Sequence, residues 1–137
     1  MSSETFTYIP QPESLSQVRQ DISLLLEQAG WQDRQMDISL AIGEVLQNII
    51  RYGFAGGSND GQIRVELTIS NDRLSFVITD DAPPSDPSGW VTTHRPPEEG
   101  GLGLNLIDAL ADEVRYTMLS AGNQAELSFH KAQAAPA

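Results

Sequence analysis

The sequence contains no cysteine, only two histidines and no long hydrophobic run. Without cysteine there can be no disulfide framework and no thiolate metal site. His94 and His130 stand far apart in the chain, so no close-spaced metal-binding motif is visible. No apolar run approaches the ~20 residues that a transmembrane helix needs. The first ten residues, MSSETFTYIP, lack the basic-then-apolar pattern of a signal peptide. We therefore expect a cytoplasmic protein that does not enter a membrane.

Basic residues are also scarce. Eight Lys and Arg stand against 19 Asp and Glu, which gives a formal net charge of −11. Such a surface repels phosphate, so we expect no direct binding to nucleic acid or to anionic lipid. If the chain takes part in gene control, it is expected to act through another protein.

The length of 137 residues suits one domain with its own core. Residues 1–131 are expected to form this domain, and 132–137 a disordered tail. Hydrophobic periodicity predicts strand 5–9, helices 14–29 and 33–54, hairpin strands 63–69 and 74–79, helix 102–111, and hairpin strands 114–119 and 125–130. Strands joined mostly by hairpins imply a mixed, mostly antiparallel sheet, and the three amphipathic helices are expected to cover one face of it. The predicted fold class is α+β, a two-layer α/β sandwich.

A polar row borders the apolar stripe of helix 33–54. Glu44 and Asn48 are four residues apart and share a face, and Arg51 follows three residues later. A carboxylate and a carboxamide suit a hard cation such as Mg²⁺, which takes few protein ligands and keeps several waters. The alternative is a solvated helix flank, and the row taken alone favours that alternative.

A second motif is the end of the strand 74–79, where the sequence continues as TDDAPPSDP. Asp80 leaves the strand first, and its carboxylate could accept a hydrogen bond from the exocyclic amino group of a purine. Asp81 is expected to face solvent. The alternative is ordinary turn chemistry, because Asp, Pro and Ser are the residues that turns use.

A third motif is GGLGLNLIDAL, which begins at Gly100. Gly101 and Gly103 permit close backbone approach, and a helix N-terminus offers free N–H groups to phosphate. The alternative is a glycine-rich hinge in front of a core helix, since a lone glycine cluster is weak evidence.

Together and in this order, the three motifs resemble those of the GHKL ATPases, which comprise the ATP domains of gyrases, chaperones, histidine kinases and mismatch-repair proteins. The phrases EVLQNIIRY and GGLGLNLI are similar to those of the anti-sigma-factor serine/threonine kinases of bacterial partner-switching systems. The resemblance extends over nearly the whole chain. It implies a Bergerat-type ATP-binding fold, with ATP and Mg²⁺ as cofactors.

The resemblance assigns roles to the polar residues. Glu44 would be the general base or water-orienting acid of phosphoryl transfer, and Asn48 would ligate the Mg²⁺ that bridges the ATP phosphates. Arg51 stands where the family often has a basic residue near the nucleotide. Asp80 would accept from the adenine amino group.

The glycine motif and the long loop before it receive roles in the same way. Gly101 and Gly103 would approach the phosphates, together with the N–H groups of Leu102 and Leu104. The segment between Pro87 and Gly100 would be the ATP lid.

Two departures from the family pattern stand out. Ala82 and Pro84 replace the two glycines of the loop that follows Asp80, so adenine would meet Ala82 where glycine is usual. Glu98 and Glu99 hold the place where kinase members often carry a lid arginine. Arg95 is the lid arginine that could replace it at the γ-phosphate.

The resemblance implies an anti-sigma regulatory factor that phosphorylates a Ser or Thr of an anti-anti-sigma (STAS-domain) partner. Its other expected partners are a sigma factor or an equivalent regulator, and a second copy of the chain in a homodimer. One alternative is a non-catalytic binding switch that sequesters a sigma factor and uses nucleotide only to set its shape. Another is a degenerate Bergerat fold that binds no nucleotide.

Overall fold

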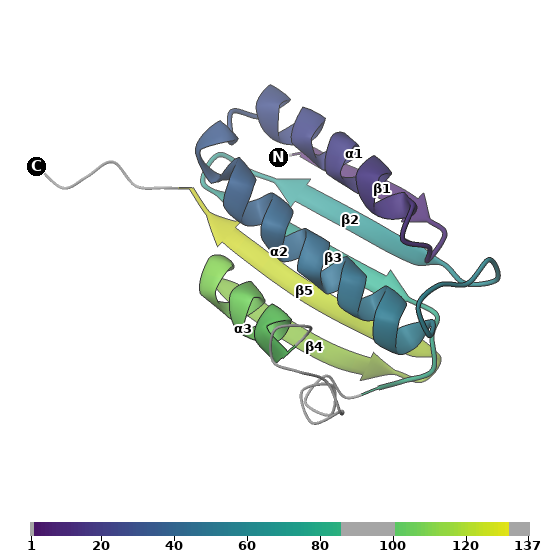
Figure 1. Ribbon diagram of the computed structural model, residues 1–137. Coiled ribbons are helices and arrows are strands. Elements are labelled where there is room, and N and C mark those ends of the chain that lie inside the picture. Colours follow the sequence, from purple (N-terminus) through teal and green to yellow (C-terminus); the bar gives the residue numbers. More distant parts are fainter. Residues whose placement is uncertain (1, 86–100, 132–137) are drawn as a thin grey trace, which may run out of the picture.

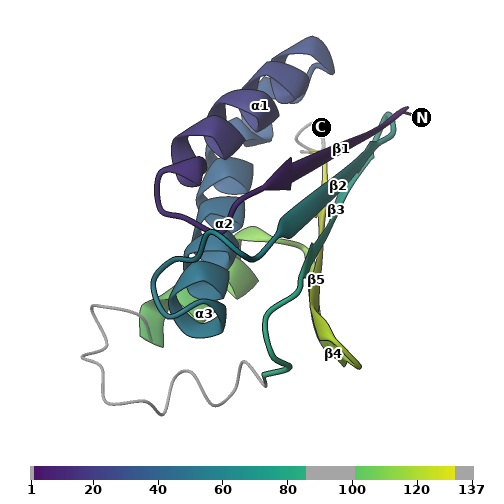
Figure 2. The same cartoon turned by 90° about the vertical axis from the view of Figure 1, so that its right-hand side faces the viewer.

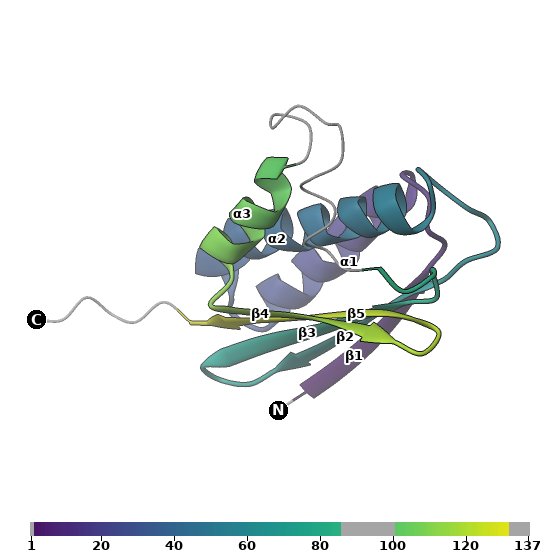
Figure 3. The same cartoon turned by 90° about the horizontal axis from the view of Figure 1, so that it is seen from below.

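The computed structural model describes residues 2–85 and 101–131, with the backbone alone for 101–105. These residues form two layers, a five-stranded sheet and three α-helices on one side of it (Figures 1 and 3). The elements are β1 (Ser2–Tyr8), α1 (Ser14–Gln28), η1 (Gln32–Arg34), α2 (Gln35–Asn48), η2 (Ile49–Gly53), β2 (Ile63–Ile69), β3 (Arg73–Asp80), α3 (Gly101–Leu110), β4 (Glu113–Leu119) and β5 (Gly122–His130). The predicted two-layer α+β sandwich is confirmed. The expected lid and the expected tail lie outside the described residues.

The strand order in the sheet is β1-β2-β3-β5-β4, and all four neighbouring pairs are antiparallel. The sheet of the described residues is therefore antiparallel rather than mixed. The central strand β3 lies between β2 and β5, so that Asp80 is opposite Ile63 on one side and opposite Asn123 on the other. The last residue of β3 is thus held from both sides.

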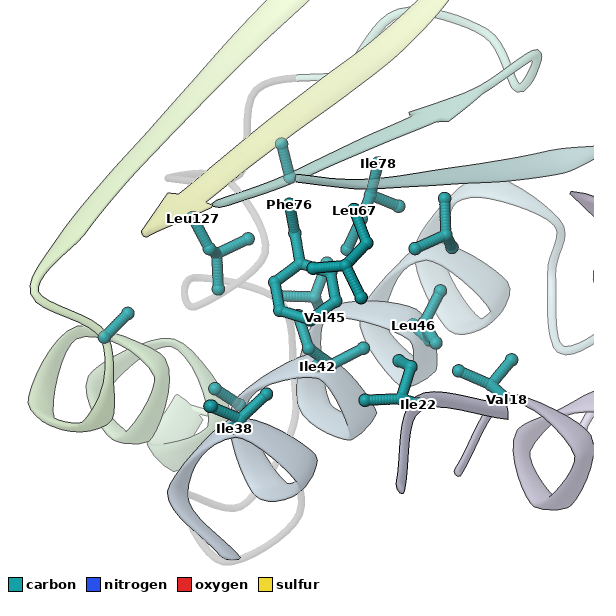
Figure 4. Close-up of a cluster of buried hydrophobic side chains, with 14 of the residues drawn as sticks. Val18, Ile22, Ile38, Ile42, Val45, Leu46, Leu67, Phe76, Ile78 and Leu127 are labelled. Carbon is teal, nitrogen blue, oxygen red and sulfur yellow. The ribbon is translucent and has the colours of Figure 1, made fainter. Parts of the chain in front are cut away.

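The core fills the space between the helices and the sheet (Figure 4). Alternate residues of β2, β3 and β5 point towards the helices, which is why burial alternates along β2 and β3. In β5 it alternates from Ala125 to Leu127, and Ser128 is buried as well. The side chains that meet in this layer include Val18, Ile22, Ile38, Ile42, Val45, Leu46, Leu67, Phe76, Ile78 and Leu127. Burying this apolar surface is the main force that holds the two layers together.

None of the helices that the structure describes lies over the other face of the sheet, as Figure 2 shows. Its side chains are mostly polar, and three Arg–Glu pairs lie across it, namely Arg64–Glu66, Arg73–Glu113 and Arg115–Glu126. Such residues tolerate contact with water, so this face needs no protein cover. Among the described residues, no helix has the length and apolar character to cross a bilayer.

The structure corrects the predicted helix 33–54. The α-helix ends at Asn48, and the chain continues as the π-helical turn η2. β1 begins at Ser2 rather than Thr5, because its first residues pair with the end of β2. β5 begins at Gly122, so the turn of the last hairpin is Ser120–Ala121.

Candidate functional site

The turn η2, which continues α2, and the end of β3 lie close together at one end of the molecule (Figure 1). The contact is close, because a Cβ built on Gly53 would lie 2.9 Å from the Cβ of Ala82. Of the polar side chains that the structure describes, only Asn48, Asp80 and Ser128 are buried. Ser128 donates to the Glu113 carboxylate on the sheet. The other two, Asn48 and Asp80, stand at the ends of α2 and β3.

Asn48 is buried with an unused hydrogen-bonding group. Its side chain is 4% exposed, and its Nδ2 has no partner among the described atoms. A buried polar atom without a partner costs about 1–3 kcal/mol, so such atoms in native proteins call for an explanation. A ligand that binds beside Asn48 would supply one.

Glu44 lies one helical turn before Asn48 and is half-buried. Its carboxylate forms no ion pair or hydrogen bond with the residues that the structure describes. The (i, i+4) spacing on α2 places both side chains on one face, as the sequence predicted. The pair therefore combines a carboxylate and a carboxamide at the edge of the core.

Asp80 continues the inward alternation of β3 after Leu74, Phe76 and Ile78, and it is 6% exposed. Its Oδ1 accepts from the Ala82 N–H at 3.0 Å and from Asn123 Nδ2 at 3.1 Å. Burial raises the pKa of the Asp80 carboxyl above its ordinary value, and the neighbouring charge of Asp81 adds to this, while the two hydrogen bonds oppose it. A carboxylate held in this state is an acceptor that gains from a further donor.

Asp81 is exposed, as expected, and its Oδ1 accepts from the Gln62 N–H at 2.9 Å. This bond ties the loop after β3 to the start of β2. Asp81 therefore has a structural contact, and Asp80 is the carboxylate that faces inward.

Asn123 is the residue that sequence reasoning missed. It lies opposite Asp80 on β5 and bonds to Asp80, Pro83 and Ser85. A signal was present, because residues 125, 127 and 129 are apolar and inward-facing, and the same alternation puts a polar Asn123 on the inward side. Turn formation does not require a polar side chain on the inward side of a strand, so such a residue indicates a functional site.

The structure places Ala82 and Arg51 differently from the expectation. Ala82 is 1% exposed and its methyl group packs against Gly53, so only its backbone is left to meet a ligand. Arg51 is exposed on η2. Because a π-helical turn holds more residues than an α-helical turn, the (i, i+3) geometry predicted from Asn48 to Arg51 does not apply. Their roles at a nucleotide stay predictions.

The glycine motif does open a helix, since α3 begins at Gly101. Gly101, Leu102, Gly103 and Leu104 therefore occupy its first turn, where N–H groups are free for an anion. Their contact with phosphate stays a prediction. Arg95 lies outside the described residues.

The donor set fits Mg-ATP. The described residues include no cluster of three or more His, Cys, Asp or Glu that could hold a metal ion. A Mg²⁺ ion beside Asn48 would therefore take its other ligands from phosphates and water, which is how Mg²⁺ is commonly held at nucleotide sites. Asp80, which ends β3 at the same end of the molecule, supplies a hydrogen-bond acceptor for the base.

Known proteins resemble this chain in sequence. The family model described as a histidine kinase-like ATPase domain matches residues 9–129. The serine-protein kinase RsbW of Listeria monocytogenes is 31% identical over 114 residues, which cover 76% of this chain and 72% of that protein. RsbW of Bacillus licheniformis is 28% identical over 113 residues, covering 75% and 70%.

Solved structures share the fold. The RsbU and RsbW domains of Rv1364c from Mycobacterium tuberculosis superpose with a TM-score of 0.70 at 21% identity, over 94% of this chain and 32% of that one, so this chain spans about a third of it. The histidine kinase domain of a blue-light activated kinase from Erythrobacter litoralis gives a TM-score of 0.54 at 21% identity, over 72% and 45%. With the family model matching most of its length, the chain belongs to the histidine kinase-like ATPase domain family.

Proposed function

We propose that the protein is an anti-sigma regulatory factor that uses Mg-ATP to phosphorylate a Ser or Thr of an anti-anti-sigma STAS-domain partner. The observation that carries the proposal is the buried Asn48 amide without a partner, on the same helix face as Glu44 and at the end of the fold that holds Asp80. The similarity to proteins named serine-protein kinase RsbW supports the choice of acceptor.

The chain's own residues divide the work. Asp80 accepts from the adenine amino group. Asn48 offers its amide oxygen to Mg²⁺ and its Nδ2–H, which has no partner among the described atoms, to a phosphate oxygen. The metal, when bound, neutralises charge on the phosphates. Glu44 takes the proton from the hydroxyl group of the partner's Ser or Thr. The oxygen of that hydroxyl bonds to the γ-phosphorus, and ADP leaves. Because phosphoryl transfer needs little covalent help from the protein, the roles of these groups are positioning and charge neutralisation.

The partners follow from charge and from the family. A net charge of −11 disfavours binding to DNA, so control of transcription would run through a sigma factor or an equivalent regulator held by this protein. Phosphorylation of the STAS-domain partner would weaken its hold on this protein and leave the regulator bound. A homodimer is part of the proposal.

The experiment is a transfer assay with γ-labelled ATP, Mg²⁺ and a STAS-domain protein from the same organism. We expect label on a Ser or Thr of that protein, loss of transfer in Glu44→Gln, and unchanged Mg-ATP binding of this variant by calorimetry. Met36→Gln, on the exposed side of the same helix, is the matched control and should transfer normally. Wild-type protein that binds Mg-ATP without transfer would contradict the kinase proposal.

A non-catalytic switch is the second candidate. Glu98 and Glu99 favour it, since they put negative charge where related kinases often have an arginine for the γ-phosphate. In that case Glu44→Ala would leave capture of the sigma factor and its dependence on ATP unchanged. Loss of that control in Glu44→Ala would speak against a purely conformational role.

A further inference from the structure

We propose that Asn123 is the positioning residue that makes the site selective for adenine. It would act through Asp80, by fixing the carboxylate and the loop that follows it, without reacting itself. The inference rests on the proposed function in one respect, namely that the base of ATP binds at Asp80.

Asn123 uses both ends of its amide on one loop. Nδ2 donates to Asp80 Oδ1 at 3.1 Å and to the Pro83 carbonyl oxygen at 3.2 Å. Oδ1 accepts from the Ser85 N–H at 2.8 Å. Three bonds from one side chain therefore hold the first, fourth and sixth residues of the segment 80–85.

Besides Asn123, the Asp81–Gln62 bond and the contact of the Ala82 methyl with Gly53 hold the start of this loop. Residues 81–85 form no helix or strand, and Pro83 and Pro84 have no N–H to donate. A proline-rich loop is stiff, but its orientation relative to the sheet has to be set from outside. The amide of Asn123, which is anchored on β5, fixes the part of the loop at Pro83 and Ser85.

The contact also leaves one carboxylate oxygen available. Asp80 Oδ1 already accepts from Ala82 and Asn123, and no hydrogen bond from the described residues ends on Oδ2. With Oδ1 held at two points, Oδ2 has a fixed direction. A fixed acceptor pairs with an amino group of the base but not with a carbonyl oxygen at the same position. In the second case two acceptors face each other and both stay unpaired, so the affinity is lower.

The sheet places Asn123 for this task. Asp80 and Asn123 are directly opposite in the antiparallel register of β3 and β5, on the helix-facing side. Gly122, with φ +140°, lets β5 come close to the Asp80 backbone. From position 123 one side chain therefore reaches both the carboxylate and the loop.

The experiment compares ATP with ITP, which carries a carbonyl oxygen in place of the adenine amino group. Dissociation constants are measured by calorimetry with Mg²⁺ for wild type, Asn123→Ala, Asn123→Asp and the control Gln124→Ala, whose side chain lies on the other face of the sheet. We expect wild type to prefer ATP. We expect both Asn123 variants to lose roughly tenfold in ATP affinity, the order of one hydrogen bond, with little change for ITP.

Asn123→Asp keeps the shape and the acceptor for Ser85, while it replaces the donor to Asp80 by a second carboxylate that repels it. Urea denaturation of each variant checks that it is folded. An unchanged ATP-to-ITP ratio in both variants would overturn the inference, and so would an equal fall for both nucleotides, which is what a merely structural role gives. Wild type that binds neither nucleotide overturns the ATP site and this inference with it. Wild type that binds ATP selectively but transfers no phosphate overturns the kinase proposal alone.

Discussion

Gly122 lies so close to Asp80 that a Cβ at position 122 would stand 2.1 Å from the Asp80 carbonyl oxygen. The neighbour is backbone of a central strand and cannot move aside. Gly122 also has φ +140°, which disfavours any side chain. We expect Gly122→Ala to lower the free energy of unfolding by more than about 1 kcal/mol and to weaken ATP binding by shifting β5 away from Asp80. Urea denaturation and calorimetry measure the two effects.

Gly56 provides the control for this prediction. It also has a positive φ, +96°, but a Cβ there would meet nothing within 4 Å. Gly56→Ala therefore carries conformational strain without a clash. If Gly56→Ala and Gly122→Ala cost the same, the close approach of Gly122 to Asp80 has no energetic weight.

Asp80→Asn should separate stability from binding. Since burial raises the folded-state pKa of Asp80 above its unfolded value, protonation favours the folded state, and stability is lost as pH rises through the folded pKa. Asparagine carries no charge and can keep the acceptor for Ala82 and Asn123. We expect Asp80→Asn to be at least as stable as wild type at pH 7, with its advantage shrinking towards pH 4, and to bind ATP poorly.

Denaturation curves at both pH values and ATP calorimetry test this. A variant that is less stable than wild type at pH 7 would show that the ionised carboxylate is a net stabiliser. If the ATP affinity of Asp80→Asn equals that of the wild type, Asp80 does not bind the base and the segment after β3 is an ordinary turn.

Arg34 is expected to be the most costly arginine to remove among those described. Its guanidinium donates to the carbonyl oxygens of Leu110 and His130, pairs with Asp37 and Asp112, and lies 5.8 Å from the centre of the Phe129 ring. It thus joins the start of α2, the end of α3 and the end of β5. Arg34→Ala should cost about 2–4 kcal/mol, because it leaves partly buried acceptors unpaired.

Arg64→Ala is the matched control for Arg34→Ala. Arg64 pairs with Glu66 at 2.7 Å on the uncovered sheet face, and both side chains are well exposed. Exposed pairs contribute about 0–1 kcal/mol. Similar losses for the two variants, in urea denaturation, would contradict the role given to Arg34.

Tyr116→Phe should be neutral or stabilising at pH 8. The Tyr116 hydroxyl is buried without a partner in the described structure, and burial, with the charge of Asp108, raises its pKa to about 12. Because the folded pKa exceeds the unfolded one, the wild type loses stability as pH rises from about 10 to about 12, and the phenylalanine variant is spared this loss.

Unfolding at pH 8 and pH 11, with tyrosinate absorbance as a second readout, measures the effect of Tyr116→Phe. A loss of more than about 1 kcal/mol at pH 8 would mean that the hydroxyl has a bonding partner in solution.

The hydrophobic periodicity within single helices and strands was sufficient to predict the fold and part of the site. The alternation in β2 and β3 is a period-two signal, and it places Asp80 on the inward side together with Phe76 and Ile78. The (i, i+4) spacing of Glu44 and Asn48 needs only helical geometry. Both predictions use neighbours within one element, where sequence distance and spatial distance agree.

The rest depends on contacts between distant segments. Asn123 contacts Asp80 because β5 pairs with β3 in the register that puts the two residues opposite each other. No local sequence motif predicts that register. The change from α2 to η2 at Ile49 escapes a periodicity argument because apolar residues continue across it. The burial of the Ala82 methyl follows from its contact with Gly53, which lies 29 positions earlier in the chain.

Gly53 and Ala82 share room for one methyl group between them, since two Cβ atoms there would be 2.9 Å apart. Gly53→Ala alone is therefore crowded, whereas exchanging the two residues restores the fit, so their effects are not additive. The alanine that departs from the family's loop pattern thus fits in this chain because position 53 carries no side chain.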